Sequence, residues 1–348
     1  MKFNKYRLHT LQVICLLLLS GCQESGVSGP TKGAESFSYE TITSQDIEAI
    51  ETKIEERNTS PENIGLVEQS YITTRLHNKQ EIRVYEYLID NKLRYGTVIF
   101  PPDYEGENLP VAVLLDGLNQ SDKQLQVEQT LDLYQYSSEL LADFIVIIPI
   151  FRGTYHQSVE RYESEGSFCD AYDGAADDSV ALINLVSQEI PEANMEAILT
   201  VGGSRGGNVA YLLGQRDSRI AMSIAMAGPT DFYRQSVADQ YNEQYQCQFF
   251  DGYNAQQAKQ KMLASSPLHF VASSPITRIH HSINDNVVPT WNAQEMHDSL
   301  IQNNKDTILY WYYNGGHSDF YGLNHDYLLN FNDNVSEFMT VWNDKNIQ

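Results

Sequence analysis

The chain has 348 residues, of which 23 are Lys or Arg and 46 are Asp or Glu, so its formal charge at pH 7 is −23. A chain of this length builds one large α/β domain or two small domains, and its 42% hydrophobic and 20% charged residues are typical of a packed globular core. The acidic excess excludes nucleic-acid binding as the function of this chain, because phosphate binding requires clustered Lys and Arg. It also excludes electrostatic docking on anionic lipid headgroups.

The first 21 residues are predicted to be a secretory signal peptide. Lys2, Lys5 and Arg7 form a basic start, and the apolar stretch 11–19 is shorter than the roughly 20 residues that a membrane-spanning helix needs. Leu19-Ser20-Gly21-Cys22 resembles the cleavage signal of bacterial lipoproteins, in which the Cys receives a lipid. This resemblance implies a protein that is lipid-anchored through Cys22 in the bacterial cell envelope, at the outer membrane or on the periplasmic face. A plain cleaved signal is the alternative.

Two cysteines remain once Cys15 leaves with the signal peptide and Cys22 carries lipid: Cys169 and Cys247. In an oxidising compartment two thiols can pair, so we expect a disulfide between them. The alternative is two unrelated buried thiols. Neither cysteine has a second metal ligand at the spacing of a zinc site, so no metal is expected.

The first elements expected after the signal peptide are a flexible tether over residues 22–43 and an N-terminal helical extension over residues 44–79. A helix begins near Ser44, because Ile47, Ile50 and Ile54 recur at helical spacing. Two stretches of alternating apolar and polar residues between Arg83 and Pro102 then predict an antiparallel hairpin. This hairpin opens the main domain, which is expected to cover residues 80–348.

Beyond the hairpin, short apolar strands alternate with helical patterns. Near-continuous apolar runs are typical of strands in a parallel sheet covered on both faces. The pattern predicts a doubly wound α/β fold with a mostly parallel sheet of about eight strands and helices on both faces. The expected strands are Val111–Leu115, Phe144–Ile150, Ala197–Val201, Ile220–Ala225, Ile276–Ile283 and Thr307–Tyr313, and the expected helices are Asp178–Ile190, Asn208–Gln215, Trp291–Gln302 and Tyr327–Trp342.

The segment 229–274 departs from this alternation, because aromatic residues occur in it among Gln and Asn with little β-branching. We expect a helical insertion that forms a lid over the active-site edge, before the next strand. An ordinary crossover that carries several aromatic residues is the alternative.

A nucleophilic serine is indicated by Gly202-Gly203-Ser204-Arg205-Gly206, a G-x-S-x-G motif between a predicted strand and a predicted helix. Such a serine needs a base and an orienting carboxylate, which follow in the order Asp, then His, in this type of fold. Asp285 follows the strand that ends at 283, and His317 follows the strand that ends at 313. Each alone is compatible with a turn or loop residue, but together they predict a Ser204-Asp285-His317 triad.

A metal-dependent hydrolase built on His280 and His281 is the alternative chemistry. Neighbouring residues on a strand point to opposite faces of the sheet, so these two side chains cannot line one site. We therefore interpret both as structural.

With these motifs the chain resembles the prolyl oligopeptidase branch of the α/β-hydrolase superfamily, from about residue 80 to the C-terminus. The resemblance is carried by Gly202–Gly207, the Asp-x-Val-Val-Pro turn at Asp285, Gly315-Gly316-His317, Phe151-Arg152-Gly153 and Asp177-Asp178. It implies a serine hydrolase that cleaves an ester or a short peptide through an acyl-enzyme, with no cofactor. A non-catalytic binding lipoprotein on a hydrolase scaffold is the alternative. Nothing in the sequence predicts the oligomeric state.

The chain departs from this family at the oxyanion loop, which commonly reads His-Gly-Gly and here reads Leu115-Asp116-Gly117-Leu118-Asn119. We expect backbone N–H groups of Arg205 and of Leu118 or Gly117 to stabilise the oxyanion. The larger peptidases of the family also carry an N-terminal β-propeller, for which the residues before position 80 are too few. Arg152 is a candidate substrate-binding residue, because its guanidinium could hold a substrate carboxylate, and the same holds for the Arg205 side chain. For each arginine the alternative is a structural ion pair with Asp or Glu.

Overall fold

The structure is a computed structural model that describes residues 37–346, apart from 75–78, 103, 105, 107, 120–122 and 318–323. The predicted signal peptide, Cys22 and the tether up to residue 36 lie outside the described residues. The last part of the predicted tether is packed rather than flexible. The Phe37 ring contacts Tyr233 and Phe250, and the Tyr39 hydroxyl lies 3.1 Å from that of Tyr245.

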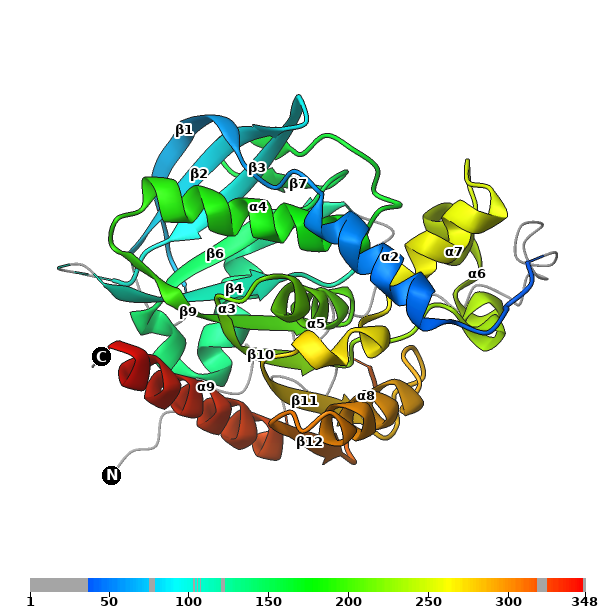
Figure 1. Cartoon of the computed structure of the whole chain (residues 1–348). Helices are drawn as coiled ribbons and strands as arrows, with labels where there is room; N and C mark the ends of the chain where they lie inside the picture. The colour runs from blue at the N-terminus through cyan, green and yellow to red at the C-terminus, as the bar shows by residue number, and fades with distance from the viewer. Residues whose placement is uncertain are drawn as a thin grey trace.

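Nine strands form the central sheet, in the order β1-β2-β3-β6-β4-β9-β10-β11-β12 (Figure 1). β1, β2 and β3 form an antiparallel meander, β3 is antiparallel to β6, and all pairs from β6 to β12 are parallel. All six residues of β6 are buried, as expected for a strand covered on both faces. The strands are β1 (Glu62–Ile72), β2 (Gln80–Ile89), β3 (Lys92–Ile99), β4 (Leu109–Leu115), β6 (Ile145–Ile150), β9 (Ala193–Gly203), β10 (Ile220–Met226), β11 (Ile276–Ser282) and β12 (Thr307–Tyr312).

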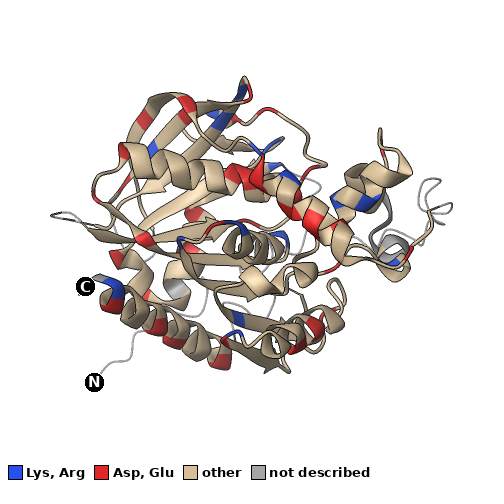
Figure 2. Cartoon of the chain, viewed as in Figure 1, with Lys and Arg blue, Asp and Glu red and all other residues tan. Residues whose placement is uncertain are grey.

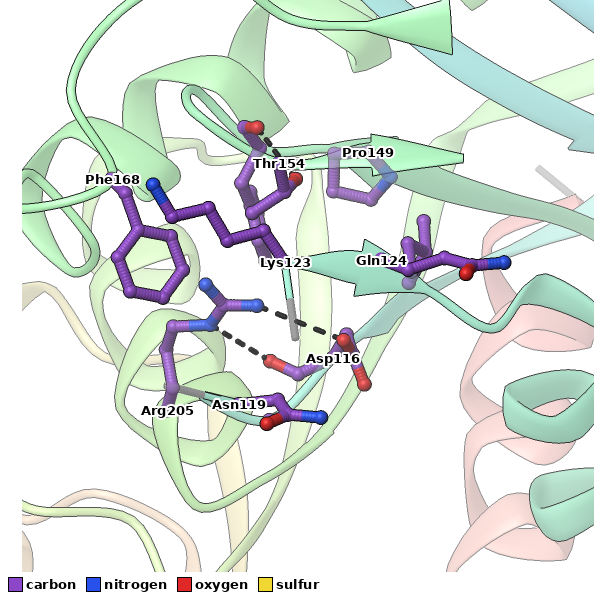
Figure 3. A pocket seen from close by; sticks show the side chains of 11 residues that line it. Asp116, Asn119, Lys123, Gln124, Pro149, Thr154, Phe168 and Arg205 are labelled. Carbon is purple, nitrogen blue, oxygen red and sulfur yellow. Dashed lines mark hydrogen bonds and ion pairs between the residues drawn. The ribbon is translucent and has the colours of Figure 1, made fainter. Parts of the chain in front are cut away.

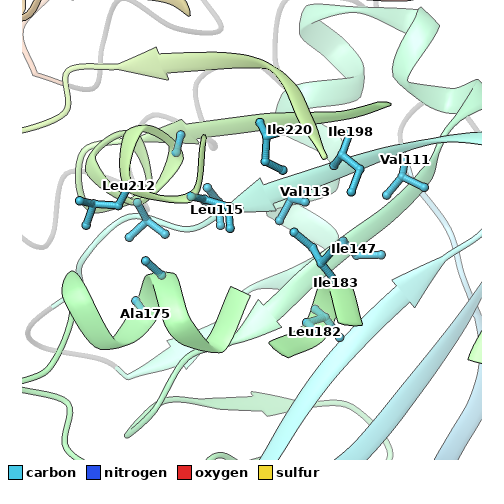
Figure 4. Packing of buried hydrophobic residues seen from close by; sticks show 14 of the residues in the cluster. Val111, Val113, Leu115, Ile147, Ala175, Leu182, Ile183, Ile198, Leu212 and Ile220 are labelled. Atoms are coloured by element: carbon cyan, nitrogen blue, oxygen red, sulfur yellow. The ribbon is translucent and has the colours of Figure 1, made fainter. Parts of the chain in front are cut away.

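Helices cover both faces of the sheet, which confirms the predicted fold class. On one face, α4 (Asp173–Glu189), α5 (Arg205–Arg216) and α8 (Trp291–Gln302) bury aliphatic side chains such as Leu182 and Leu212 against the strands (Figure 4). On the other face lie α3 (Val127–Ser137) and α9 (His325–Asn346), which buries an aromatic row from Tyr327 to Phe338. None of the described helices is both long enough and apolar enough to cross a membrane.

The predicted insertion is helical. It consists of α6 (Gln235–Phe249), α7 (Ala255–Ala264) and the short turns Pro267–His269 and Val271–Ser273, and it lies beside α2 (Ser44–Glu55) (Figure 1). These elements share a third, largely aromatic core, against which Leu118 and Trp291 also pack. The predicted oxyanion loop therefore contributes Leu118 to the same core as the insertion. A disulfide joins Cys247 of α6 to Cys169, with their Cα atoms 5.4 Å apart, which is the pairing expected from the sequence.

In its described residues, the predicted helical extension 44–79 holds only one helix. α2 begins at Ser44, as predicted, and its N-cap is Thr43, whose hydroxyl accepts the Asp46 N–H. The chain then forms β1, which pairs with β2 and makes the sheet one strand larger than expected. β1 escapes prediction because it is an edge strand in which apolar and polar residues do not alternate regularly and most side chains are exposed. Three very short strands form a small second sheet: β5 (Gln124–Leu125), β7 (Tyr155–Gln157) and β8 (Arg161–Glu163).

Candidate active site

Ser204 occupies the sharp turn between β9 and α5, with a backbone conformation (φ 56°, ψ −118°) that L-residues rarely adopt. A Cβ atom on Gly202 would lie 2.2 Å from the Gly206 oxygen, and one on Gly206 would lie 2.0 Å from the Leu115 oxygen. The turn therefore requires glycine at both positions. The Ser204 N–H donates to the Met226 carbonyl oxygen at 2.8 Å, which fixes the turn against β10.

A continuous hydrogen-bonded chain joins the three residues predicted as a triad. Nε2 of His317 lies 2.9 Å from Oγ of Ser204, and Nδ1 of His317 lies 2.8 Å from Oδ2 of Asp285. Oδ1 of Asp285 accepts the N–H groups of Val287 at 2.9 Å and Val288 at 2.8 Å, so both carboxylate oxygens are engaged. The Asp285 side chain is fully buried and that of His317 is 14% exposed. This is the arrangement of a nucleophile, a base and an orienting carboxylate.

Two loops at the C-terminal ends of β11 and β12 deliver Asp285 and His317 to this position. The hydroxyl of Ser282 donates to the Gly315 carbonyl oxygen at 2.7 Å, and the side-chain amide of Asn284 donates to the Tyr313 carbonyl oxygen at 2.8 Å. These bonds connect the loop that carries the acid to the loop that carries the base. The site thus lies where parallel strands of open α/β sheets usually place it.

His281 is a residue of the site that the sequence pattern did not reveal. Its Nε2 lies 2.9 Å from the Val288 carbonyl oxygen and 3.4 Å from Oδ2 of Asp285. Burial lowers the pKa of His281, so the neutral ring donates through Nε2 and braces the loop that carries Asp285. The spacing of four residues to Asp285 is the only sequence signal for this contact.

His280 is directed away from this site. Its ring stacks on Tyr310, and its two ring nitrogens lie 2.7 Å from the Tyr312 hydroxyl and 2.8 Å from the Asn334 amide. Burial lowers the pKa of His280 to about 3, which keeps the ring neutral. The two neighbouring histidines therefore serve opposite faces of the sheet, as expected for a strand.

The predicted oxyanion loop lies beside the nucleophile. A Cβ atom on Gly117 would lie 3.8 Å from the Gly203 oxygen and 4.0 Å from Cβ of Ser204. Arg205 is the first residue of α5, where a backbone N–H has no acceptor within its own helix.

The structure corrects the prediction that Arg152 binds substrate. Nε and Nη2 of Arg152 donate to the Asp178 carboxylate at 3.0 and 2.8 Å, and Nη1 donates to Asp170 at 2.5 Å. Asp178 is 3% exposed and also accepts Nε of Arg94 at 3.0 Å. Because two carboxylates already neutralise the guanidinium, Arg152 is a structural ion-pair residue, which was the alternative expected for an arginine in an acidic chain.

Acidic residues are distributed over most of the elements, for example along α2 and α9 (Figure 2). Every arginine that the structure describes has a carboxylate within 4 Å: Arg57, Arg83, Arg94, Arg152, Arg161, Arg205, Arg216, Arg219, Arg234 and Arg278. The weakest of these pairs is next to the nucleophile, where Nη2 of Arg205 lies 3.7 Å from Oδ2 of Asp116.

Comparison with known proteins identifies a family and a set of structural relatives. The model of the prolyl oligopeptidase family matches residues 132–342. Similar solved structures are an acylaminoacyl peptidase in complex with Z-Gly-Gly-Phe-chloromethyl ketone (18% identity, TM-score 0.57, 75% of this chain and 41% of that chain), the acetyl xylan esterase of Paenibacillus sp. R4 (16%, 0.61, 88% and 99%) and the dipeptidyl peptidase 4 of Porphyromonas gingivalis (18%, 0.52, 78% and 35%). No curated protein matches the chain.

These structural similarities establish the fold alone, because the sequence identities are only 16–18%. The chain spans about two fifths of the acylaminoacyl peptidases it matches, 41% and 39% of their length. The family match is stronger evidence, since it covers more than half of the chain and includes the turn at Ser204 and the loops of Asp285 and His317. The chain therefore belongs to the prolyl oligopeptidase family, within the α/β-hydrolase superfamily of serine peptidases and esterases.

Proposed function

We propose that this protein is a serine hydrolase that cleaves an ester or a peptide bond through an acyl-enzyme on Ser204. The observation that supports the proposal is the hydrogen-bonded chain from Ser204 Oγ through His317 to Asp285, with contacts of 2.9 and 2.8 Å. It ends on a fully buried carboxylate whose other oxygen accepts two backbone N–H groups. A binding protein has no need of such an arrangement at a strained, glycine-flanked serine.

In the proposed reaction, Oγ of Ser204 attacks the substrate carbonyl carbon while Nε2 of His317 takes its proton. Asp285 accepts the hydrogen bond from Nδ1, holds the ring in this tautomer and stabilises the imidazolium. The leaving alcohol or amine receives the proton from His317, and an acyl-enzyme ester remains on Ser204. Water, activated by the same histidine, then hydrolyses this ester and frees the acid.

The negative charge on the carbonyl oxygen is stabilised by backbone donors on both sides of Ser204. The first donor is the backbone N–H of Arg205, because Arg205 is the first residue of α5 and the helix dipole favours an anion at this end. The second comes from Leu118 or Gly117, in the loop that lies beside Ser204. A loop without the second glycine of the family motif can thus still supply a backbone donor.

The structural relatives include both peptidases and acetyl xylan esterases, so the proposal covers an ester or a short peptide as substrate. We also propose export and lipid anchoring through Cys22, which is supported by the signal-like residues before it and by the Cys169–Cys247 disulfide, a feature of oxidising compartments. Metabolic labelling with palmitate in the native host tests the anchor: label should appear in the wild type and be lost in Cys22→Ala. Equal labelling of both proteins would contradict it.

Hydrolysis of 4-nitrophenyl esters by the signal-less protein tests the activity. Ser204→Ala should lower kcat by at least about 10³-fold, because the nucleophile is lost, while the melting temperature stays near that of the wild type. Ser218→Ala is the matched control, since Ser218 is an exposed serine in the turn after α5. Wild-type turnover in Ser204→Ala, or equal losses in both variants, would contradict the proposal.

A further inference from the structure

A small pocket opens directly beside the proposed oxyanion loop (Figure 3). Gly117 and Arg205 line it, and both are neighbours of Ser204, one through space and the other along the chain. Other walls of the pocket are Asp116, Lys123, Pro149, Phe151 and Phe168. A substrate group in this pocket would therefore be attached close to the bond that Ser204 attacks.

The pocket holds more positive charge than its own carboxylate neutralises. Arg205 is 3% exposed, yet its Nε donates to the backbone oxygen of Asp116 at 3.2 Å and the Asp116 carboxylate is 3.7 Å from Nη2. Burial lowers the pKa of Arg205, which is the mark of a guanidinium with too little compensation. The well-compensated Arg152, with three bonds to carboxylates at 2.5 to 3.0 Å, shows the contrast.

Lys123 adds a second cation to the same space. Among the described residues it has no carboxylate within 4 Å, and its ammonium lies over the Phe168 ring, 5.0 Å from the centroid. In Figure 3 the Lys123 side chain extends over the pocket, with Phe168 beside its amine and Arg205 below it. Among the described residues that line the pocket, Lys123 and Arg205 are two cations against the single carboxylate of Asp116, in a chain whose net charge is −23.

We propose that this pocket binds a carboxylate of the substrate, so that the protein prefers esters or amides with a carboxylate close to the bond that is cleaved. The inference rests on the proposed function and names its substrate class. An anion between Lys123 and Arg205 receives two charge-assisted contacts. It neutralises the positive charge that the Asp116 carboxylate leaves over. The free volume of the pocket is about 10 Å³, space for roughly one water, so one oxygen of a carboxylate can enter it, whereas a phosphate or a sugar ring cannot.

Matched pairs of chromogenic esters test this preference. The mono-4-nitrophenyl ester of glutarate carries a carboxylate on the acyl side, and 4-nitrophenyl butyrate is its neutral partner. The acetate of 5-hydroxy-2-nitrobenzoate carries the carboxylate on the leaving group, and 4-nitrophenyl acetate is its partner. We expect the wild type to favour the anionic member of at least one pair in kcat/KM, after correction for the chemical reactivity of each ester.

Lys123→Gln should lower this preference about tenfold and Lys123→Glu should lower it further, with the neutral esters changed by less than about twofold. Added salt should weaken the wild-type preference, since Lys123 is exposed. Lys92→Gln, an exposed lysine beside the turn of the β2–β3 hairpin, is the control and should leave the preference unchanged. An unchanged preference in both Lys123 variants, or no wild-type preference in either pair, would overturn the proposal.

A binding measurement separates this inference from the proposed function. Ligand-observed NMR with the Ser204→Ala protein compares monomethyl glutarate with methyl butyrate, and does not require turnover. Stronger binding of the anionic ester that is lost in Ser204→Ala/Lys123→Glu would support the carboxylate site, even if the wild type hydrolysed no ester. Equal binding of the two esters, or anionic binding that survives Lys123→Glu, would refute it.

Discussion

The buried ion pair of Asp178 gives a prediction whose size follows from its contacts. Asp178 accepts four hydrogen bonds: Arg94 Nε and Arg152 Nη2 at Oδ1, and the Arg152 N–H and Nε at Oδ2, at 2.8 to 3.0 Å. In Asp178→Asn the new NH₂ group faces two of these donors, whichever way the amide is turned. The loss of two hydrogen bonds to charged groups costs about 1.5–3 kcal/mol for each bond. This agrees with the cost of breaking a buried ion pair, which is about 3–5 kcal/mol.

Urea unfolding of the purified protein at pH 7 measures this loss. We expect Asp178→Asn to lower the free energy of unfolding by about 3–5 kcal/mol, with an unchanged m-value. Glu163→Gln is the matched control, because the Arg161–Glu163 pair is 51% and 54% exposed and its loss should cost less than about 0.5 kcal/mol. A loss below about 1 kcal/mol in Asp178→Asn, or equal losses in the two variants, would refute the structural role of Arg152.

Three further predictions concern the triad, the disulfide and the pH dependence. Asp285→Asn should lower kcat for 4-nitrophenyl esters by about 10⁴-fold in the folded protein, because His317 loses its orienting carboxylate; a loss below tenfold would contradict that role. Cys247→Ser should lower the free energy of unfolding by up to about 4 kcal/mol, since the disulfide spans 78 residues; an unchanged urea midpoint would show that it contributes nothing. Burial raises the pKa of Asp177 to about 6, above its unfolded value, so its contribution to stability is present below about pH 4 and is lost between about pH 4 and 6. The stability of Asp177→Asn relative to the wild type should therefore rise over this interval, and a difference independent of pH would contradict the shift.

The strands that position the site were predictable because each is dominated by a single physical requirement. β4, β6, β9 and β10 are covered on both faces, so their residues are almost all apolar and stand out as runs. The order Ser204, Asp285, His317 was predictable because each residue lies in the turn or loop that follows a strand, and the ends of parallel strands meet at one edge of the sheet. The sequence thereby indicated which three side chains come together.

Features that depend on tertiary contact or on solvent could not be predicted in this way. β1 lies at the sheet edge with mostly exposed side chains, and its pairing with β2 leaves no regular alternation of apolar and polar residues. The role of Arg152 was decided by Asp170 and Asp178, and nothing in the spacing of these residues indicates that they meet. The pocket of Asp116, Lys123 and Arg205 likewise arises where the connection after β4 meets the start of α5.

The most direct test of the central claim is mass spectrometry after reaction with a fluorophosphonate, which bonds to activated serines and to few others. The signal-less wild-type protein should gain one phosphonyl group per chain, on the peptide that contains Ser204. Ser204→Ala should gain none, and His317→Ala should react at least about 10³-fold more slowly, because the serine then has no base. A folded wild-type protein that stays unmodified, or that is modified at another serine, would contradict the account.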